Sequence, residues 1–427
     1  MRLIISAFVF FICLMSFGQN QFQALDTIGS KAFDKNLYNE YKLKYTSYNK
    51  SLDGFKSNQR KVIKELYSNN QKDFLEKIHD NNYISDKGIN TYLQELLNEI
   101  LNANAIDPKD YKILLSKDSE INAHNTGDGT VVVNYGMFLT VENEDELVFV
   151  LSHEVGHQYL NHVKKEIEAI AALKNSEEIV KKTEEIRSQK YSKATAADNL
   201  LKNIYYKSYR DRREKEIEAD SIGFNLYKKT TRDLNHTISL LKKLDDSNQE
   251  QDSLIVADYK FCFENGDFKL KSKYFETSQS LFQKYDYKSA ALIDSLKTHP
   301  DCSARIQLIN KRLVNPMGNA KNSDYFIKTK KNSTYQNLLN LFSNKEYGTC
   351  LYESLKLYKK NKSDSELKRI IYLTLNEIVS SKKNYTISKY INSVDYKYNT
   401  DSENRFIDFI NNIKISDLEI ILTQFKS

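Results

Sequence analysis

Residues 143–168 read NEDELVFVLSHEVGHQYLNHVKKEIE, and within them His153-Glu154-Val155-Gly156-His157 sets two histidines four positions apart. Four residues make about one turn of an α-helix, so both imidazoles share one face and can bind a single metal ion. Glu154 follows the first histidine directly, where its carboxylate can take a proton from a water molecule at the metal. Zinc suits this ligand set because it binds histidine nitrogen and carboxylate oxygen and keeps an open coordination position.

The residues around this motif predict a buried helix from Asn143 to about Glu168. Asn143 and Glu146 have the spacing of a capping box, and acidic residues gather where a helix N-terminus attracts them. The apolar side chains that lie opposite the histidine pair are Leu147, Val148, Leu151, Val155 and Tyr159. A helix that is apolar around most of its circumference is buried, and buried histidines need partners. This context argues against surface histidines at an accidental spacing.

A catalytic zinc site needs a third protein ligand, and Glu216 is our choice. It lies on a second predicted helix and is followed four residues later by Asp220, which can stand behind a ligand histidine and fix its tautomer. Ala219 and Gly223 are small, so this helix can approach the first one closely. Glu218 is the rival ligand, but it points to another face of the helix.

The rest of the chain is predicted to be mainly helical with a small β-sheet, an α+β fold. Its 427 residues include only 12 glycines and 3 prolines, so helix breakers are scarce. One segment before the histidine helix predicts β-structure. A short strand is expected from Tyr111 to Leu115, a turn-rich stretch from Asn122 to Gly129, and a β-branched strand from Thr130 to Tyr135.

The chain divides into four expected parts. Residues 1–18 combine a basic start, an apolar run and small residues at a cleavage position, which favours a cleaved secretory signal over an uncleaved anchor. Residues 19–65 are predicted to be a polar helical segment, and residues 66–315 the domain that carries the histidine motif. After a linker at 315–319, residues 330–427 are predicted to be a helical C-terminal domain, either a small bundle or a tetratricopeptide-like repeat.

Charge and cysteine content exclude two classes of protein. The formal net charge is +6, but basic and acidic residues are interleaved along the chain, which is typical of a solvated surface. The charge is only weak support for nucleic-acid binding, and no nucleic-acid partner is expected. Outside the signal, the cysteines are Cys262, Cys302 and Cys350, which is no disulfide framework. A bridge from Cys262 to Cys302 stays open for an oxidising compartment.

Three motifs occur in a familiar order: the histidine motif, then Glu216-x-x-Ala219-Asp220, then His299-Pro300 with Arg305 shortly after. Together they resemble the signatures of the CAAX prenyl protease/HtpX family, metallopeptidase family forty-eight. The segment from Ile121 to Gly136 also resembles the strand that precedes the active-site helix in that family. The resemblance implies that residues 66–315 form a gluzincin-like zinc metallopeptidase domain.

The resemblance assigns zinc, one ion per chain, to His153, His157 and Glu216, with Glu154 as the general base. It makes Asp220 the partner behind a ligand histidine. It puts His299 near the metal, either stabilising the developing oxyanion or covering the open coordination position at rest. Arg305 is expected to pair with a buried carboxylate. The strand at 130–134 is expected to be an edge that binds an extended substrate.

Two features depart from the family. Prenyl proteases and HtpX-type members have several membrane spans, whereas this chain has no candidate span after its signal, so prenylated substrates are not expected. The long interval between His157 and Glu216 also suggests either an insertion or a long helical hairpin.

The leading hypothesis is an exported endopeptidase, periplasmic and acting on misfolded or unassembled envelope proteins, with contacts at the membrane surface or outer-membrane assembly sites. A second hypothesis is a chaperone-like or scaffold factor that binds unfolded envelope proteins through the helical tail with little proteolysis. A third is a secreted enzyme that degrades foreign protein. The sequence does not decide the cleavage specificity or the oligomeric state.

Overall fold

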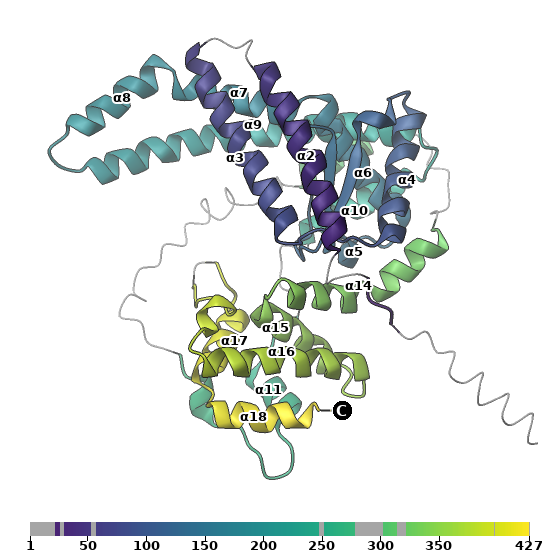
Figure 1. Ribbon diagram of the computed structural model, residues 1–427, viewed down its shortest axis with the longest axis vertical. Helices are drawn as coiled ribbons and strands as arrows, with labels where there is room; N and C mark the ends of the chain where they lie inside the picture. The colour runs from purple at the N-terminus through teal and green to yellow at the C-terminus, as the bar shows by residue number, and fades with distance from the viewer. Residues whose placement is uncertain are drawn as a thin grey trace, which may run out of the picture.

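A computed structural model of the chain describes residues 22–25, 30–52, 57–246, 252–277, 302–313, 322–396 and 398–426. Helices dominate it, and a single small sheet lies within a first group of elements; a second, all-helical group lies beside it (Figure 1). The predicted mainly helical α+β fold is confirmed. None of the helices in these ranges has the length and apolar character that a bilayer span requires. The expected signal, the linker at 315–319 and His299 all lie outside the described residues.

The sheet has three strands, β1 (Lys112–Ser116), β2 (Ala123–Asn125) and β3 (Thr130–Asn134), in the order β1-β3-β2. β3 runs parallel to β1 and antiparallel to β2. The expectation that residues 130–134 form an edge is therefore wrong. Part of the stretch predicted as turn is itself a strand, because a tight turn returns the chain and pairs β2 with β3. The free edge on this side belongs to β2.

Helices cover both faces of the sheet. On one face, Val131 and Val133 join the main core with α4 (Lys87–Ala103) and α6 (Glu144–Tyr159). On the other face, Leu114 and Val132 pack against α2 (Lys31–Ser51) and α3 (Ser57–His79). Because successive strand residues point to opposite faces, β3 contributes side chains to both cores.

The histidine helix α6 begins after Asn143, whose side chain accepts a hydrogen bond from the Glu146 N–H at 2.9 Å. The other half of the predicted capping box is absent from this described stretch, because the Glu146 carboxylate instead accepts from the Glu142 N–H and from Lys243. The helix also ends earlier than expected. Asn161 adopts a left-handed φ of 55°, and a separate helix, α7 (His162–Lys174), begins directly after it.

Helix α9 (Lys193–Lys228) packs against α6 at very close range. A Cβ added to Gly223 would lie 2.8 Å from His153 Cα, and one added to Gly156 would lie 2.9 Å from the Ala219 carbonyl oxygen. The backbones of the two helices are in contact at these positions. The close approach that Ala219 and Gly223 predict is therefore confirmed. This approach brings side chains of α9 to the histidine face of α6.

Substituting Gly223 by alanine should therefore push the two helices apart. We expect Gly223→Ala to lower the free energy of unfolding by about 1–3 kcal/mol, the usual cost of overpacking a tight site, and to weaken metal binding. Chemical denaturation with and without added zinc measures both effects. Asn225→Ala, at an exposed position of the same helix, is the matched control. Equal stability of the two variants would contradict the prediction.

The other elements of the first group are η2 (Pro108–Asp110), α5 (Met137–Thr140), α8 (Glu177–Ser188), α10 (Asn235–Asp246) and α13 (Cys302–Asn310). α8 and the first half of α9 project away from the rest of the group (Figure 1). They form the long helical hairpin expected between His157 and Glu216.

The second group has its own apolar core. Its helices are α14 (Asp324–Ser343), α15 (Tyr347–Tyr358), α16 (Ser365–Lys383), η4 (Ile387–Lys389), α17 (Asp401–Asn412) and α18 (Ile415–Gln424). α11 (Val256–Phe263) and η3 (Ser272–Phe275) also bury their side chains in this core, although the sequence put them in the domain of residues 66–315. An apolar face predicts burial, but it does not say which core buries it.

This division also decides the cysteine question. Cys262 lies in the second core and Cys302 in the first, and both are free and buried. The bridge between them that the sequence left open is therefore not formed.

Candidate metal centre and active site

Three side chains converge where α6 meets α9. The Nε2 atoms of His153 and His157 lie 3.0 Å apart. Glu216, from α9, puts Oε2 at 3.3 Å from His153 Nε2 and Oε1 at 3.4 Å from His157 Nε2. One ligand atom from each residue can be chosen so that all lie within 4.8 Å of one another. The two sequence motifs, distant along the chain, thus supply one cluster of two imidazoles and a carboxylate.

Asp220 and Arg305 stand behind His153. Asp220 Oδ1 lies 2.9 Å from His153 Nδ1, and the Arg305 guanidinium donates to both Asp220 oxygens, at 2.5 and 2.8 Å. All three side chains are buried. Burial alone would raise the pKa of Asp220, but Arg305 and His153 outweigh it and hold that pKa at about 2. The carboxylate therefore stays ionised, and Arg305 has the buried acidic partner that the sequence led us to expect.

A second series of contacts supports His157, and no pattern in the sequence predicts it. His157 Nδ1 lies 2.9 Å from Nδ1 of the buried His162, whose Nε2 lies 3.1 Å from Glu218 Oε2. Had α6 continued, His162 would be turned about 140° from His157 around the helix axis. Because the helix ends at Asn161, the His162 side chain instead faces His157. Glu218, the rival ligand, faces this histidine instead of the metal cluster.

These contacts fix the tautomers of both ligand histidines. Asp220 accepts a hydrogen from His153 Nδ1, so His153 Nε2 keeps its lone pair. Glu218 accepts from His162 Nε2, which leaves His162 Nδ1 to accept from His157 Nδ1. Both ligand Nε2 atoms then direct lone pairs into the same small space. Such an arrangement is unfavourable unless a cation lies there.

The charges at the cluster also favour a bound cation. Glu216 Oε2 is buried and has no hydrogen-bond partner among the residues that the structure describes. Burial disfavours a charged imidazole, yet Asp220 and Glu216 outweigh it and raise the pKa of His153 to about 10. Without a metal ion, a proton therefore occupies His153 Nε2, and a bound metal ion would replace that proton. The space between these side chains therefore attracts positive charge. Two neutral imidazoles and one carboxylate are a donor set that fits a catalytic zinc ion.

Glu154 lies on α6 next to His153 and is buried. Burial raises the pKa of its carboxyl, while the neighbouring histidines and a backbone hydrogen bond from Asn125 oppose that rise. A carboxylate with a raised pKa is a better proton acceptor near neutral pH than an exposed one. The contact with Asn125 also places Glu154 beside strand β2.

Removing His162 should loosen His157. We expect His162→Ala to weaken zinc binding about 10–100-fold, the usual effect of removing a hydrogen-bonded partner of a ligand histidine. Competition with a chromophoric chelator measures the affinity, and the visible spectrum of the cobalt-substituted protein reports the ligand geometry. His162→Gln, whose amide oxygen can still accept from His157, should keep more of the affinity. Wild-type affinity in His162→Ala would show that His157 needs no such support.

Comparison with known proteins identifies the region that carries this site. The family model described as Peptidase family M48 matches residues 89–313. Metalloprotease YcaL of Escherichia coli (strain K12) is 34% identical over 122 residues, which cover 29% of this chain and 45% of YcaL. A putative beta-barrel assembly-enhancing protease of Vibrio cholerae serotype O1 is 28% identical over 172 residues, which cover 38% of this chain and 34% of that protein. The chain thus spans less than half the length of either relative.

Proposed function

This chain belongs to peptidase family M48, and from that premise we propose that it is a zinc-dependent endopeptidase with one zinc ion per chain. The observation that carries the proposal is the convergence of His153, His157 and Glu216, with the buried Glu154 carboxylate beside them. The expected resemblance to metallopeptidase family forty-eight is confirmed, and with it the class of metal-dependent peptidases.

In the proposed reaction His153, His157 and Glu216 hold the zinc. When bound, zinc supplies Lewis-acid chemistry, activating water and polarising the scissile carbonyl. Glu154 accepts a proton from the attacking water and later delivers it to the leaving amine nitrogen. Asp220 and His162 hold the two imidazoles in the tautomers that the ligands require. His299 is proposed to stabilise the oxyanion or to cover the open position at rest, a role that rests on its His-Pro motif alone.

We place the substrate along the free edge of β2. The bonds from Asn134 N to Asn122 O and from Thr126 N to Thr130 O direct residues 122, 124 and 126 toward β3. The backbone groups of Ala123 and Asn125 therefore point away from β3, as alternate residues do in a strand. An extended polypeptide can add to this edge. Because Asn125 also contacts Glu154, a chain added there passes beside the catalytic carboxylate.

The substrates are proposed to be misfolded or unassembled envelope proteins met after export, in the periplasm. The apolar segment at residues 1–18 supports export, and the name of the Vibrio cholerae relative refers to β-barrel assembly. The helical unit at 330–427 is proposed to recruit substrates or to contact the membrane surface.

The decisive test is zinc content and casein cleavage by the purified protein, before and after chelation. We expect about one zinc per chain, loss of cleavage on chelation and recovery with zinc. Glu216→Ala should bind zinc more weakly than wild type. Folded wild-type protein that neither binds zinc nor cleaves casein would overturn the proposal. It would leave binding of unfolded envelope proteins through the helical tail as the hypothesis.

A further inference from the structure

A cavity of about 980 Å³ lies at the edge of the sheet where β2 is free. It is enclosed by α2 and α3 on one side, by the turn between β2 and β3, and by the junction of α6 and α7. This volume is at the upper end of the range, roughly 300–1,000 Å³, in which proteins bind ligands. A few residues of an extended polypeptide fit such a space.

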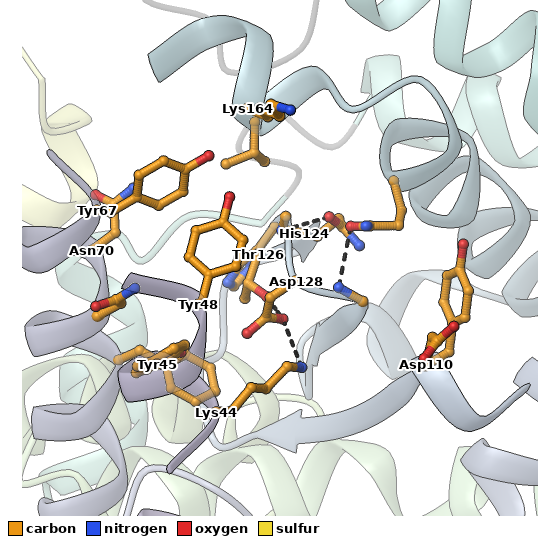
Figure 2. A pocket seen from close by; sticks show the side chains of 18 of the residues that line it. Lys44, Tyr45, Tyr48, Tyr67, Asn70, Asp110, His124, Thr126, Asp128 and Lys164 are labelled. Atoms are coloured by element: carbon orange, nitrogen blue, oxygen red, sulfur yellow. Dashed lines mark hydrogen bonds and ion pairs between the residues drawn. The ribbon is translucent and has the colours of Figure 1, made fainter. Parts of the chain in front are cut away.

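Tyrosine rings form much of the cavity wall. Figure 2 shows Tyr45 and Tyr48 from α2 and Tyr67 from α3 on one side, with Thr126 of the turn and Lys164 of α7 on other sides. The rings of Tyr48 and Tyr67 meet edge to face, with centroids 5.0 Å apart. Aromatic faces with polar tips accept large apolar side chains while leaving room for hydrogen bonds.

Charge does not favour an ionic ligand. Lys44 pairs with Asp128 at 3.3 Å, and the cavity's other lysines are accompanied by aspartates along the same wall. The lining therefore has no strong charge of either sign, and we attribute recognition to shape and to aromatic contact.

Two residues connect the cavity wall to the catalytic centre, although His153, Glu154, His157 and Glu216 do not themselves line it. Asn125, which gives a backbone hydrogen bond to Glu154, also lines the cavity, as does Gln158, one residue after His157. Asn125 Oδ1 accepts from the Gly127 N–H at 2.7 Å, whereas its buried Nδ2 has no partner within the described part of the chain. The backbone of Asn125, and not its enclosed amide nitrogen, is therefore what links the cavity to Glu154.

Ten of the 25 residues that line this cavity come from outside the region that the family model matches. α2 and α3 end before residue 89, where that match begins. The wall of tyrosines is thus an addition of this chain to the shared peptidase core.

We propose that this cavity is a specificity pocket that holds a short extended segment of the polypeptide substrate next to the scissile bond. A large aromatic or branched apolar side chain of that segment packs against Tyr48 and Tyr67. The inference rests on the proposed peptidase function and assigns the preference of the same site. It makes α2 and α3 the elements that select the substrate.

Two neighbouring asparagines on α3 provide the test. Asn69 and Asn70 are both exposed, but only Asn70 lines the cavity. Asn70→Trp should occupy the part of the cavity next to residue 70, and Asn69→Trp should leave the cavity unchanged. The substrates are internally quenched peptides that differ at one position, which carries phenylalanine, leucine or alanine and is moved stepwise along the peptide.

For wild type we expect a higher kcat/KM when phenylalanine or leucine stands at one particular position than when alanine does. Asn70→Trp should raise KM for those peptides by about tenfold, which corresponds to losing part of an apolar side-chain site, and should change kcat less than twofold. KM for the alanine peptides, which have no large side chain to place in the cavity, should rise less than KM for the phenylalanine and leucine peptides. Asn69→Trp should match wild type throughout. Cleavage without positional preference, or equal KM in the two tryptophan variants, would overturn the pocket and leave the peptidase function intact.

A binding measurement separates the pocket from catalysis. In the Glu154→Gln background, fluorescence anisotropy of labelled phenylalanine and alanine peptides should show tighter binding of the phenylalanine peptide, and Asn70→Trp should abolish the difference. If wild type cleaves nothing, the proposed function fails, and this measurement still decides whether the cavity binds peptide. Equal binding of both peptides would refute the pocket.

Discussion

Glu154→Gln is expected to lower kcat for peptide hydrolysis by roughly 10²–10⁴-fold, the range that general base catalysis contributes. Glutamine keeps the size of the side chain but cannot take a proton from the attacking water. Because Glu154 is beside the cluster and is not one of its ligands, zinc content should stay at the wild-type level. Single-turnover cleavage of a quenched peptide, with metal analysis of the same sample, measures both quantities.

The control is a charge-matched change at a distance. Glu177→Gln removes the same carboxylate from an exposed position of α8 and should keep wild-type activity. Wild-type turnover in Glu154→Gln would exclude the proton transfer proposed for this residue. Loss of zinc from Glu154→Gln would instead show that the carboxylate helps to hold the metal.

Asp220→Ala is expected to lower the free energy of unfolding of the metal-free protein by about 3–5 kcal/mol, the cost of breaking a buried ion pair by removing one partner. Arg305 is 3% exposed and would keep its charge without its bidentate acceptor. Chemical denaturation in the presence of a chelator measures this effect without the contribution of zinc. The same variant should bind zinc more weakly, because His153 Nδ1 loses its acceptor.

The double variant Asp220→Leu with Arg305→Met separates the loss of stability from the loss of zinc affinity. Replacing both charged groups by apolar side chains removes the unpaired charge, so most of the stability should return. Zinc affinity should stay low, since the tautomer of His153 is still unsupported. Equal stability of Asp220→Ala and wild type would show that the buried pair contributes little to the fold.

Local spacing explains what could be predicted of the site. His153 and His157 are one helical turn apart, so their convergence needs no knowledge of the tertiary fold, and Glu216 and Asp220 stand in the same relation on α9. The support behind His157 could not be found in this way. It depends on the left-handed Asn161, which ends α6 and redirects His162, and spacing along a continuous helix predicts the opposite orientation.

In the fold, too, local sequence patterns predict the elements but not how those elements pack. Helix content and the β-branched strand at 130–134 follow from composition and periodicity. The position of that strand at the centre of the sheet depends on pairing with the three residues of β2, which are too few to stand out in a turn-rich stretch. The shared wall of α2, α3 and the turn was equally hidden, because its residues are brought together only by the packing of the sheet.

The membership of α11 and η3 in the second core has a consequence for the order in which the chain folds as it emerges from a ribosome or an export channel. The elements around His153, His157 and Glu216 are all present once residue 313 has appeared. Phe263 must wait for Phe409, whose ring stacks against it at 5.9 Å, and for Phe425 at 6.2 Å. During that interval the aromatic residues of α11 lack their final partners and are open to a chaperone. Maturation of the protein is therefore timed by its last two helices.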